Sequence, residues 1–164
     1  MFGLQPQDLN STASLADTGI YIAHSCFGGR AKWGAVFGGY AQQDGNGCVN
    51  DVFIVFKVSV TYYQCHRHGT SLAAAVVCSP YGIATSATII AVKVLSDAGA
   101  GAYSDVISGV NYASSAATVS GKPSIALMSL GGSVSAALDA AVNTVSFQSA
   151  LLVSAQLLDQ MYRP

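Results

Sequence analysis

The chain has 164 residues, of which 51% are hydrophobic and only 9% are charged, and its net charge at pH 7 is −1. This length suits one domain with its own core, and the composition differs from that of disordered chains, which combine low hydrophobicity with high charge. Basic residues form no cluster that would favour nucleic acid or an anionic membrane surface, and Lys57 and Lys93 interrupt the two most hydrophobic stretches before either reaches the about 18 residues of a spanning helix.

The first fifteen residues, MFGLQPQDLNSTASL, lack the basic and continuous apolar regions of a signal peptide, so the chain taken literally is expected in the cytosol. The segment Ala16–Tyr21 then places Asp17 at a predicted boundary between a strand and a loop. Residues His24–Gly47 are rich in glycine and aromatic side chains, and their Gly-Gly and Asp-Gly-Asn-Gly sequences indicate turns.

An abrupt change of composition follows at Cys48–Arg67 (CVNDVFIVFKVSVTYYQCHR), which is dense in Val, Phe and Tyr and almost free of Gly and Ala. The Ala-rich character returns after it. This block therefore looks foreign to its surroundings.

From about residue 82 the pattern becomes regular. β-Branched runs bounded by turns predict strands, and apolar spacing after Ser and Gly predicts helices. The predicted order is strand Thr88–Leu95, helix Ser104–Ala117 with Ser104 as its N-cap, strand Ser124–Leu130, helix Ser133–Val145 and a third strand at Ala150–Ala155. Such an alternation predicts an α/β fold, with a parallel β-sheet, helices on both faces and the functional site at the carboxyl ends of the strands.

Four cysteines are present: Cys26, Cys48, Cys65 and Cys78. A zinc site from Cys65, His66, His68 and Cys78 would match no common zinc spacing, so unpaired thiols are favoured. A disulfide stays open, because spacing alone does not assign one.

Chemically suggestive motifs occur in a fixed order along the chain. They are D-T-G-I from Asp17, G-N-G from Gly45, H-G-T from His68, V-K-V-L-x-x-x-G-x-G from Val92 and S-L-G-G from Ser129. Each alone is weak: D-T-G also occurs in aspartic proteases, which need a second copy that is missing here, and a histidine before Gly-Thr is often structural. Their order on an α/β pattern resembles the subtilisin-like serine proteases (peptidase S8), and most closely the fungal proteinase K-like branch.

The resemblance implies a serine endopeptidase that acts on peptide or protein substrates outside the cell. Asp17 would be the orienting carboxylate and His68 the general base of a Ser–His–Asp triad. Gly99, Ala100 and Gly101 would form one wall of the substrate channel, and Ser129, Leu130, Gly131 and Gly132 the other, with the peptide bound as an added strand. Family members often bind structural calcium, but no carboxylate cluster is evident here, so no metal ligand and no cofactor is expected.

The sequence departs from the family in ways that put activity in doubt. No G-T-S motif supplies the serine, and residues 153–158 (VSAQLL) replace the turn that would carry the oxyanion asparagine. The block at 48–67 separates G-N-G from H-G-T as an insertion, and the tail diverges from about residue 146. We therefore expect residues 1–164 to be a truncated, N-terminal part of such a domain, an incomplete subtilisin-like fold.

Two function classes compete. The first is the family's endopeptidase activity, which this chain is expected to lack. The second is a non-catalytic peptide-binding pseudoenzyme fragment, or a mis-spliced product whose spliced message would join G-N-G directly to H-G-T. A zinc-dependent hydrolase using His66 and His68 ranks far behind. An incomplete sheet would expose apolar surface, so self-association is expected.

Overall fold

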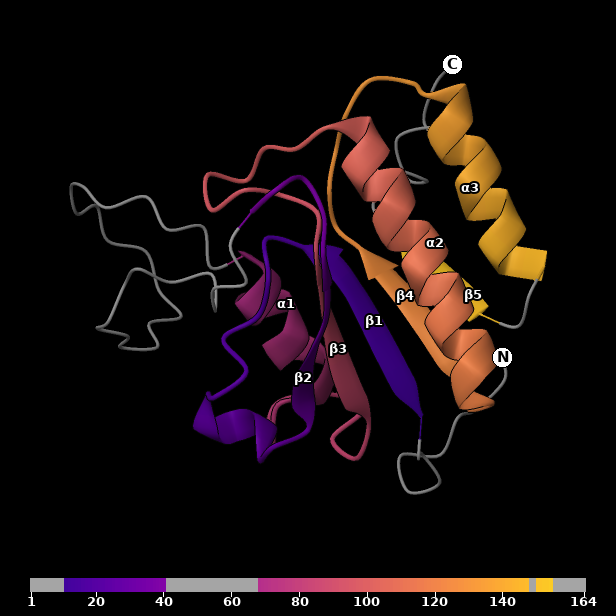
Figure 1. Ribbon diagram of the computed structural model, residues 1–164. Coiled ribbons are helices and arrows are strands. Elements are labelled where there is room, and N and C mark those ends of the chain that lie inside the picture. The colour runs from indigo at the N-terminus through magenta and orange to yellow at the C-terminus, as the bar shows by residue number, and fades with distance from the viewer. Residues whose placement is uncertain (1–10, 41–67, 148–149, 155–164) are drawn as a thin grey trace, which may run out of the picture.

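A single parallel sheet of five strands organises the molecule (Figure 1). The computed structural model describes residues 11–40, 68–147 and 150–154. Strand order across the sheet is β2-β3-β1-β4-β5, and all four pairings are parallel. The strands are β1 (Thr12–Asp17), β2 (Ala31–Val36), β3 (Thr88–Lys93), β4 (Ser124–Met128) and β5 (Ala150–Ser154).

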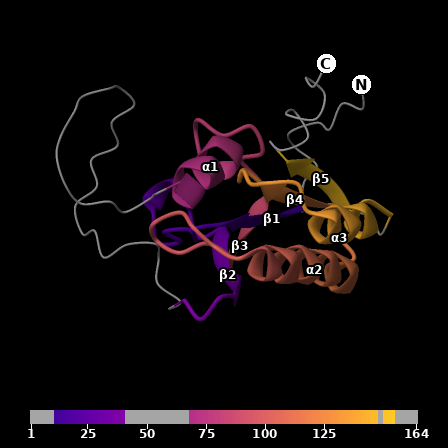
Figure 2. The same cartoon turned by 90° about the horizontal axis from the view of Figure 1, so that it is seen from above.

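Helices cover both faces of this sheet. They are α1 (His68–Val77), α2 (Tyr103–Ser120) and α3 (Ala136–Phe147), with a short 3-10 turn at Ser25–Phe27 after β1. Seen from above, α1 lies on one face, and α2 and α3 lie side by side on the other (Figure 2). This confirms the predicted α/β class. No helix within the described ranges has the length and apolar character needed to cross a bilayer.

Both predicted helix starts in the second half of the chain differ from the observed ones. Helix α2 begins after Ala102, whose side chain makes no capping hydrogen bond, so the predicted N-cap role of Ser104 is wrong. The next predicted helix, from Ser133, begins only at Ala136. There the Ser135 hydroxyl accepts a hydrogen bond from the Leu138 N–H at 3.3 Å, as an N-cap does.

Strand β2 lies within the region that the sequence predicts as turns. It forms an edge of the described sheet and pairs with β3, with an irregularity between Trp33 and Ala35. Gly34 stands at this irregularity because a Cβ there would lie 2.5 Å from Cγ2 of Ile90. A short strand with an interior glycine gives little periodic signal, which explains why the sequence pattern misses it.

Two apolar cores lie on opposite faces of the sheet because strand side chains alternate. Leu15 of β1 and Ile89 of β3 face α1, where they join Phe27 and Val77. On the other face, Ala16 and Val92 pack against residues of α2 and α3 such as Val106, Val110, Leu138 and Val145. Both cores are dry, with side chains such as Leu15 and Val110 no more than 1% exposed.

A disulfide joins Cys26, in the turn after β1, to Cys78, just beyond α1. Their Cα atoms are 4.9 Å apart, which suits a bridge. The favoured interpretation of unpaired thiols is therefore wrong for these two residues, and the Cys78 sulfur is not available to a zinc ion. Cys48, Cys65 and His66 lie outside the described residues, as do the predicted insertion at 48–67 and the tail beyond residue 154.

Candidate active site

Asp17 occupies the carboxyl end of β1, the central strand of the sheet, and its side chain is fully buried. Its backbone carbonyl accepts hydrogen bonds from the N–H groups of Val94 and Leu95, which follow β3. One carboxylate oxygen, Oδ1, accepts a hydrogen bond from the Thr18 N–H at 2.7 Å. The carboxylate is therefore fixed by its own strand end and by the neighbouring strand.

His68 is the first residue of α1 and faces this carboxylate. Its Nδ1 lies 3.0 Å from Oδ1 and 2.9 Å from Oδ2 of Asp17. A carboxylate only accepts hydrogen bonds, so Nδ1 carries the proton and the lone pair of the neutral ring resides on Nε2. Because the His68 side chain is 44% exposed while that of Asp17 is 0% exposed, the ring is open to solvent beside a buried anion. This is the arrangement of an oriented general base.

The start of α1 lies against the loop after Asp17 with no space for a side chain between them. A Cβ on Gly69 would lie 2.3 Å from the backbone oxygen of Gly19. The Gly69 N–H donates to the Thr18 hydroxyl at 3.3 Å, and the Tyr21 N–H donates to the Thr70 hydroxyl at 2.9 Å. The glycine and the threonine of the H-G-T motif therefore place His68 against Asp17.

A cleft of about 530 Å³ opens beside His68. It lies at the carboxyl ends of the strands, where a parallel sheet carries its sites. His68 and all the predicted wall residues line it: Gly99, Ala100, Gly101, Ser129, Leu130, Gly131 and Gly132. Further lining residues are Thr18, Leu95, Ala98, Tyr103, Val106 and Ser133. The structure thus brings both predicted wall segments and His68 into one cavity, while Asp17 lies buried behind the imidazole.

The loop Ser96–Gly101 forms the wall that follows β3. It closes on itself through the Ser96 N–H, which donates to the Ala100 carbonyl at 2.8 Å, and the Ala100 N–H, which donates to the Ser96 hydroxyl at 3.3 Å. Gly101 is exposed, and a Cβ there would lie 2.4 Å from the Val94 carbonyl oxygen. The wall therefore presents backbone without a side chain at Gly101, which suits a peptide that pairs as a strand, whereas the N–H of Gly99 and both backbone groups of Ala100 already make hydrogen bonds to Ser96 or Tyr40.

The second wall follows β4 and contacts the start of α2. A Cβ on Gly132 would lie 2.3 Å from the hydroxyl of Tyr103, and that hydroxyl donates to the Ser133 carbonyl at 2.6 Å. Gly131, by contrast, has no atom within 4 Å of an added Cβ, so it borders open space. The two walls are joined through Tyr103 at one end of the cleft.

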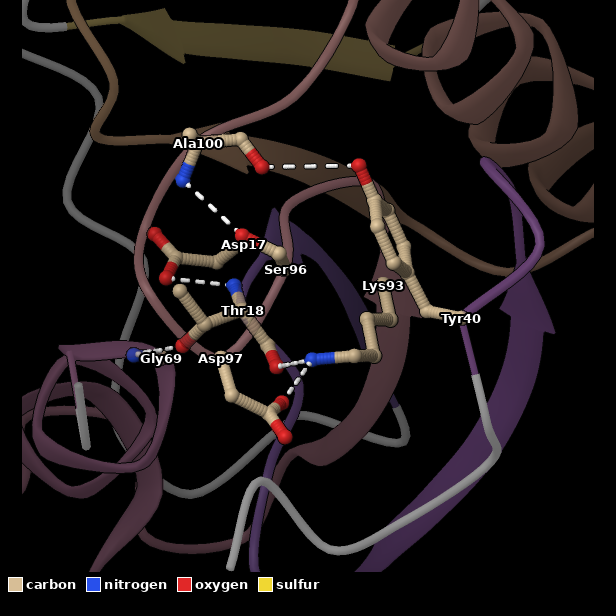
Figure 3. Close-up of polar contacts among 8 residues, drawn as sticks. All are labelled: Asp17, Thr18, Tyr40, Gly69, Lys93, Ser96, Asp97 and Ala100. Carbon is tan, nitrogen blue, oxygen red and sulfur yellow. Dashed lines mark hydrogen bonds and ion pairs between the residues drawn. The ribbon is translucent and has the colours of Figure 1, made fainter. Parts of the chain in front are cut away.

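Three residues near the site were given no role from the sequence: Tyr40, and Thr18 and Lys93, which appear there only as members of the D-T-G-I and V-K-V-L motifs. Lys93 is 1% exposed at the end of β3, and its Nζ donates to the Thr18 carbonyl at 2.5 Å and pairs with an Asp97 oxygen at 2.6 Å (Figure 3). The Tyr40 ring lies 5.7 Å from the same nitrogen. A lysine inside an otherwise apolar strand was the available signal, but Lys93 was used only as an interruption of a hydrophobic run and as part of the V-K-V-L motif.

Metal ligands are not grouped in the described parts of the chain. No three His, Cys, Asp or Glu side chains there lie close enough together to hold an ion. Asp17 is already used by His68 and Thr18, and Asp97 by Lys93. These described residues do not fit the structural calcium that the family resemblance suggests.

Known proteins resemble the chain over most of its length. The model of the subtilase family matches residues 10–156. Subtilisin-like protease 2 of Pseudogymnoascus destructans is 41% identical over 149 residues, and Subtilisin-like serine protease Pen c 1 of Penicillium citrinum is 42% identical over 142 residues. These alignments cover 88% and 85% of this chain but 31% of each relative, so the chain spans about a third of their length.

Solved structures agree with the sequence comparison. A cold-adapted subtilisin-like serine proteinase superposes with a TM-score of 0.69 at 33% identity, covering 89% of this chain and 46% of that one. Sphericase superposes with a TM-score of 0.65 at 26% identity. The parallel sheet, the helices on both faces and the ordered motifs agree with these matches, and the chain belongs to the subtilase family.

Proposed function

We propose that this chain forms the peptide-binding cleft and the Asp–His pair of a subtilase endopeptidase site, and that it hydrolyses no peptide bond by itself. The observation that carries the proposal is the position of His68. Its Nδ1 lies within 3.0 Å of both carboxylate oxygens of Asp17, and its ring borders the cleft formed by both glycine-rich walls.

The pair has the chemistry of a general base. Asp17 fixes the tautomer that leaves Nε2 free to take a proton, and its negative charge would stabilise the imidazolium that results. In the family's reaction the proton comes from a serine hydroxyl and passes to the leaving amine. Asp17 is accordingly the orienting carboxylate and His68 the base.

The proposal that these 164 residues hydrolyse no peptide bond by themselves rests on the nucleophile and the oxyanion donor. The 164 residues contain no G-T-S motif, and Ser71 follows H-G-T on the segment that carries His68 itself. No asparagine follows Asn143 to act as an oxyanion donor. Removal of one such donor alone lowers the rate by about 10²–10³, so these residues without donor and nucleophile are proposed to carry out no acyl transfer on their own.

Binding does not need those groups. Gly99, Ala100 and Gly101 on one wall, and Ser129, Leu130, Gly131 and Gly132 on the other, would bind an extended peptide through main-chain hydrogen bonds. The ligand class is therefore a peptide or an exposed protein segment.

The site of action is proposed to be extracellular. The disulfide between Cys26 and Cys78 supports this, because such bridges persist in oxidising compartments and are rare in the cytosol.

Self-association is proposed as well, with the exposed apolar loop after α1 as its support. Tyr81 is 79% exposed and Ile83 is 85% exposed. Sedimentation of the purified chain should give species larger than a monomer; a single monomeric boundary at all concentrations would contradict the idea.

Catalysis is tested on the purified full chain with casein and a fluorophosphonate probe. We expect neither casein cleavage nor labelling. Labelling that disappears in His68→Ala would show that a nucleophile is present after all and would overturn the catalytic half of the proposal.

Peptide binding is tested separately by following the amide signals of Gly99 and Gly101 during titration with acetyl-Ala-Val-Ala-Phe-amide. Gly131→Phe should fill the open space at that wall and weaken binding at least about tenfold, equivalent to about 1.4 kcal/mol. Val119→Phe is the matched control, since Val119 is 88% exposed on α2 and lies outside the cleft. Equal affinity of the two variants would contradict binding in the cleft.

A further inference from the structure

Lys93 is the feature of the described structure that the proposed chemistry leaves unexplained. It lies within β3 beside the central strand, and only 1% of its surface is exposed. A buried ammonium loses its hydration, and this loss is compensated only where hydrogen bonds and an opposite charge replace the water. An apolar residue would serve packing better, so the contacts of Nζ indicate the role of the side chain.

The first contact leads to the Asp–His pair. Nζ donates to the Thr18 carbonyl, which belongs to the peptide between Thr18 and Gly19. Thr18 also donates its N–H to Asp17 Oδ1 and accepts the Gly69 N–H on its hydroxyl. The same residue thus contacts the carboxylate and the start of the helix that carries His68. The hydrogen bond from Lys93 to the Thr18 carbonyl therefore restrains the residue that aligns the carboxylate with the start of this helix.

The second contact leads to the substrate wall. Nζ pairs with Asp97 Oδ1 at 2.6 Å, in the loop that continues to Gly99–Gly101. Tyr40 covers the ammonium with its ring and donates its hydroxyl to the Ala100 carbonyl at 3.4 Å (Figure 3). One buried cation is therefore joined to the wall through Asp97 directly and through Tyr40, and to the Asp17 loop through Thr18.

We infer that Lys93 is a positioning residue: it ties the wall loop to the Thr18 carbonyl and so holds the carboxylate of Asp17 on the Nδ1–H of His68. The inference concerns the Asp–His pair whether or not a peptide is bound. If Lys93 only stabilised β3, a change in the wall loop would leave the His68 imidazole unaffected. If Lys93 is a positioning residue, such a change should alter the hydrogen bond of the imidazole to Asp17.

The test uses the full chain with ¹⁵N-labelled histidine, and the Nδ1–H signal of His68 is assigned by its loss in His68→Ala. Exchange of this proton with solvent is measured well below the melting temperature. In Lys93→Met the exchange should be about tenfold faster, the effect expected when a hydrogen bond to a charged group is removed. Asp97→Asn should act in the same direction, although Asp97 lies in the wall loop and its side chain is 45% exposed.

Two controls separate positioning from general destabilisation. Lys32→Met makes the same substitution at an exposed position of β2 and should leave the exchange unchanged. Val110→Ala destabilises the core under α2, at a residue 1% exposed, without touching the network. Equal acceleration by Val110→Ala, or no acceleration by Asp97→Asn, would overturn the inference. Should Lys93→Met fail to fold, Asp97→Asn decides alone, because a surface change there leaves both cores intact.

Discussion

The two faces of the sheet are stabilised in different ways. Under α2 and α3 the core consists of aliphatic side chains from both helices and from the strands, such as Val92, Val110 and Leu138. In the described residues the α1 face has one α-helix, which is shorter than α2 and α3, and its core is supplemented by a disulfide and by hydrogen bonds that run from loop to helix. Only the second face carries the Asp–His pair.

This difference explains why the Asp17–His68 pair needs more than apolar packing. Apolar contacts are nondirectional and tolerate small shifts, whereas a base must stay within hydrogen-bond distance of its carboxylate. On the α1 face this distance is held by the disulfide and by the hydrogen bonds from loop to helix, which have defined geometry. Changes that remove them should therefore affect the α1 face more than similar changes affect the α2 and α3 face, and three predictions test this comparison.

The largest effect is expected from the disulfide. Replacing Cys26 and Cys78 together by alanine removes a link across a sequence separation of 52 residues, and the chain-entropy model gives about 4 kcal/mol of lost stability. Urea unfolding measures the change. Reductant should lower the free energy of unfolding of the wild type to that of the double variant and leave the variant unchanged. A wild-type stability that is insensitive to reductant would contradict the prediction.

A smaller effect is expected from a methyl group at the start of α1. In Gly69→Ala the new Cβ would lie 2.3 Å from a backbone oxygen, so we expect about 2–3 kcal/mol of destabilisation and a weaker His68 Nδ1–H signal. Gly109→Ala on α2 is the matched control. There the new Cβ would lie 2.4 Å from Cγ1 of Val94, a fully buried and β-branched side chain, so a loss of about 1–3 kcal/mol is expected there too, reduced by up to about 1 kcal/mol because alanine is the better helix former.

Thermal melts of both glycine variants measure the difference. We expect both variants to lose stability, and only Gly69→Ala to weaken the His68 Nδ1–H signal as well. An equal weakening of that signal in Gly109→Ala would contradict the comparison between the two faces.

The smallest effect is expected at Arg30, whose guanidinium donates to the carbonyls of Ala87 and Cys26. Arg30→Met keeps most of the apolar stem and removes both hydrogen bonds, so about 1–2 kcal/mol should be lost. Lys32→Met, an exposed neighbour on the same stretch of chain, should change stability by less than about 0.5 kcal/mol. Equal melting temperatures for the two variants would show that the Arg30 contacts add nothing to the α1 face.

Much of the second half of the fold follows from local pattern. The β-branched run from Thr88 and the apolar spacing from Val106 predict β3 and α2, because each element buries one defined face. Boundaries shift by a few residues where tertiary contacts decide, as at the capping Ser135. The edge strand β2 was missed because small residues and Gly34 leave no period to detect.

The candidate site divides in the same way. Motif order predicts Asp17, His68 and both wall segments, because each belongs to a short motif that can be read directly from neighbouring residues in the sequence. The disulfide and the environment of Lys93 depend on residues that are distant along the chain, and spacing does not reveal which of them meet. A charged residue within a predicted buried strand was nevertheless visible, and it indicates a partner that must be sought in three dimensions.

The central place of β1 has a consequence for the order of events during synthesis. Thr12 pairs with Thr88 on one side and with Ser124 on the other, so β1 emerges first of the described strands and acquires its neighbours only with the third and the fourth. Pairings so distant in sequence have a high contact order and form slowly, while a ribosome adds about 5–20 residues per second. A nascent chain therefore carries an unaligned Asp17 until β4 has emerged, and the proton-accepting pair matures only after that point.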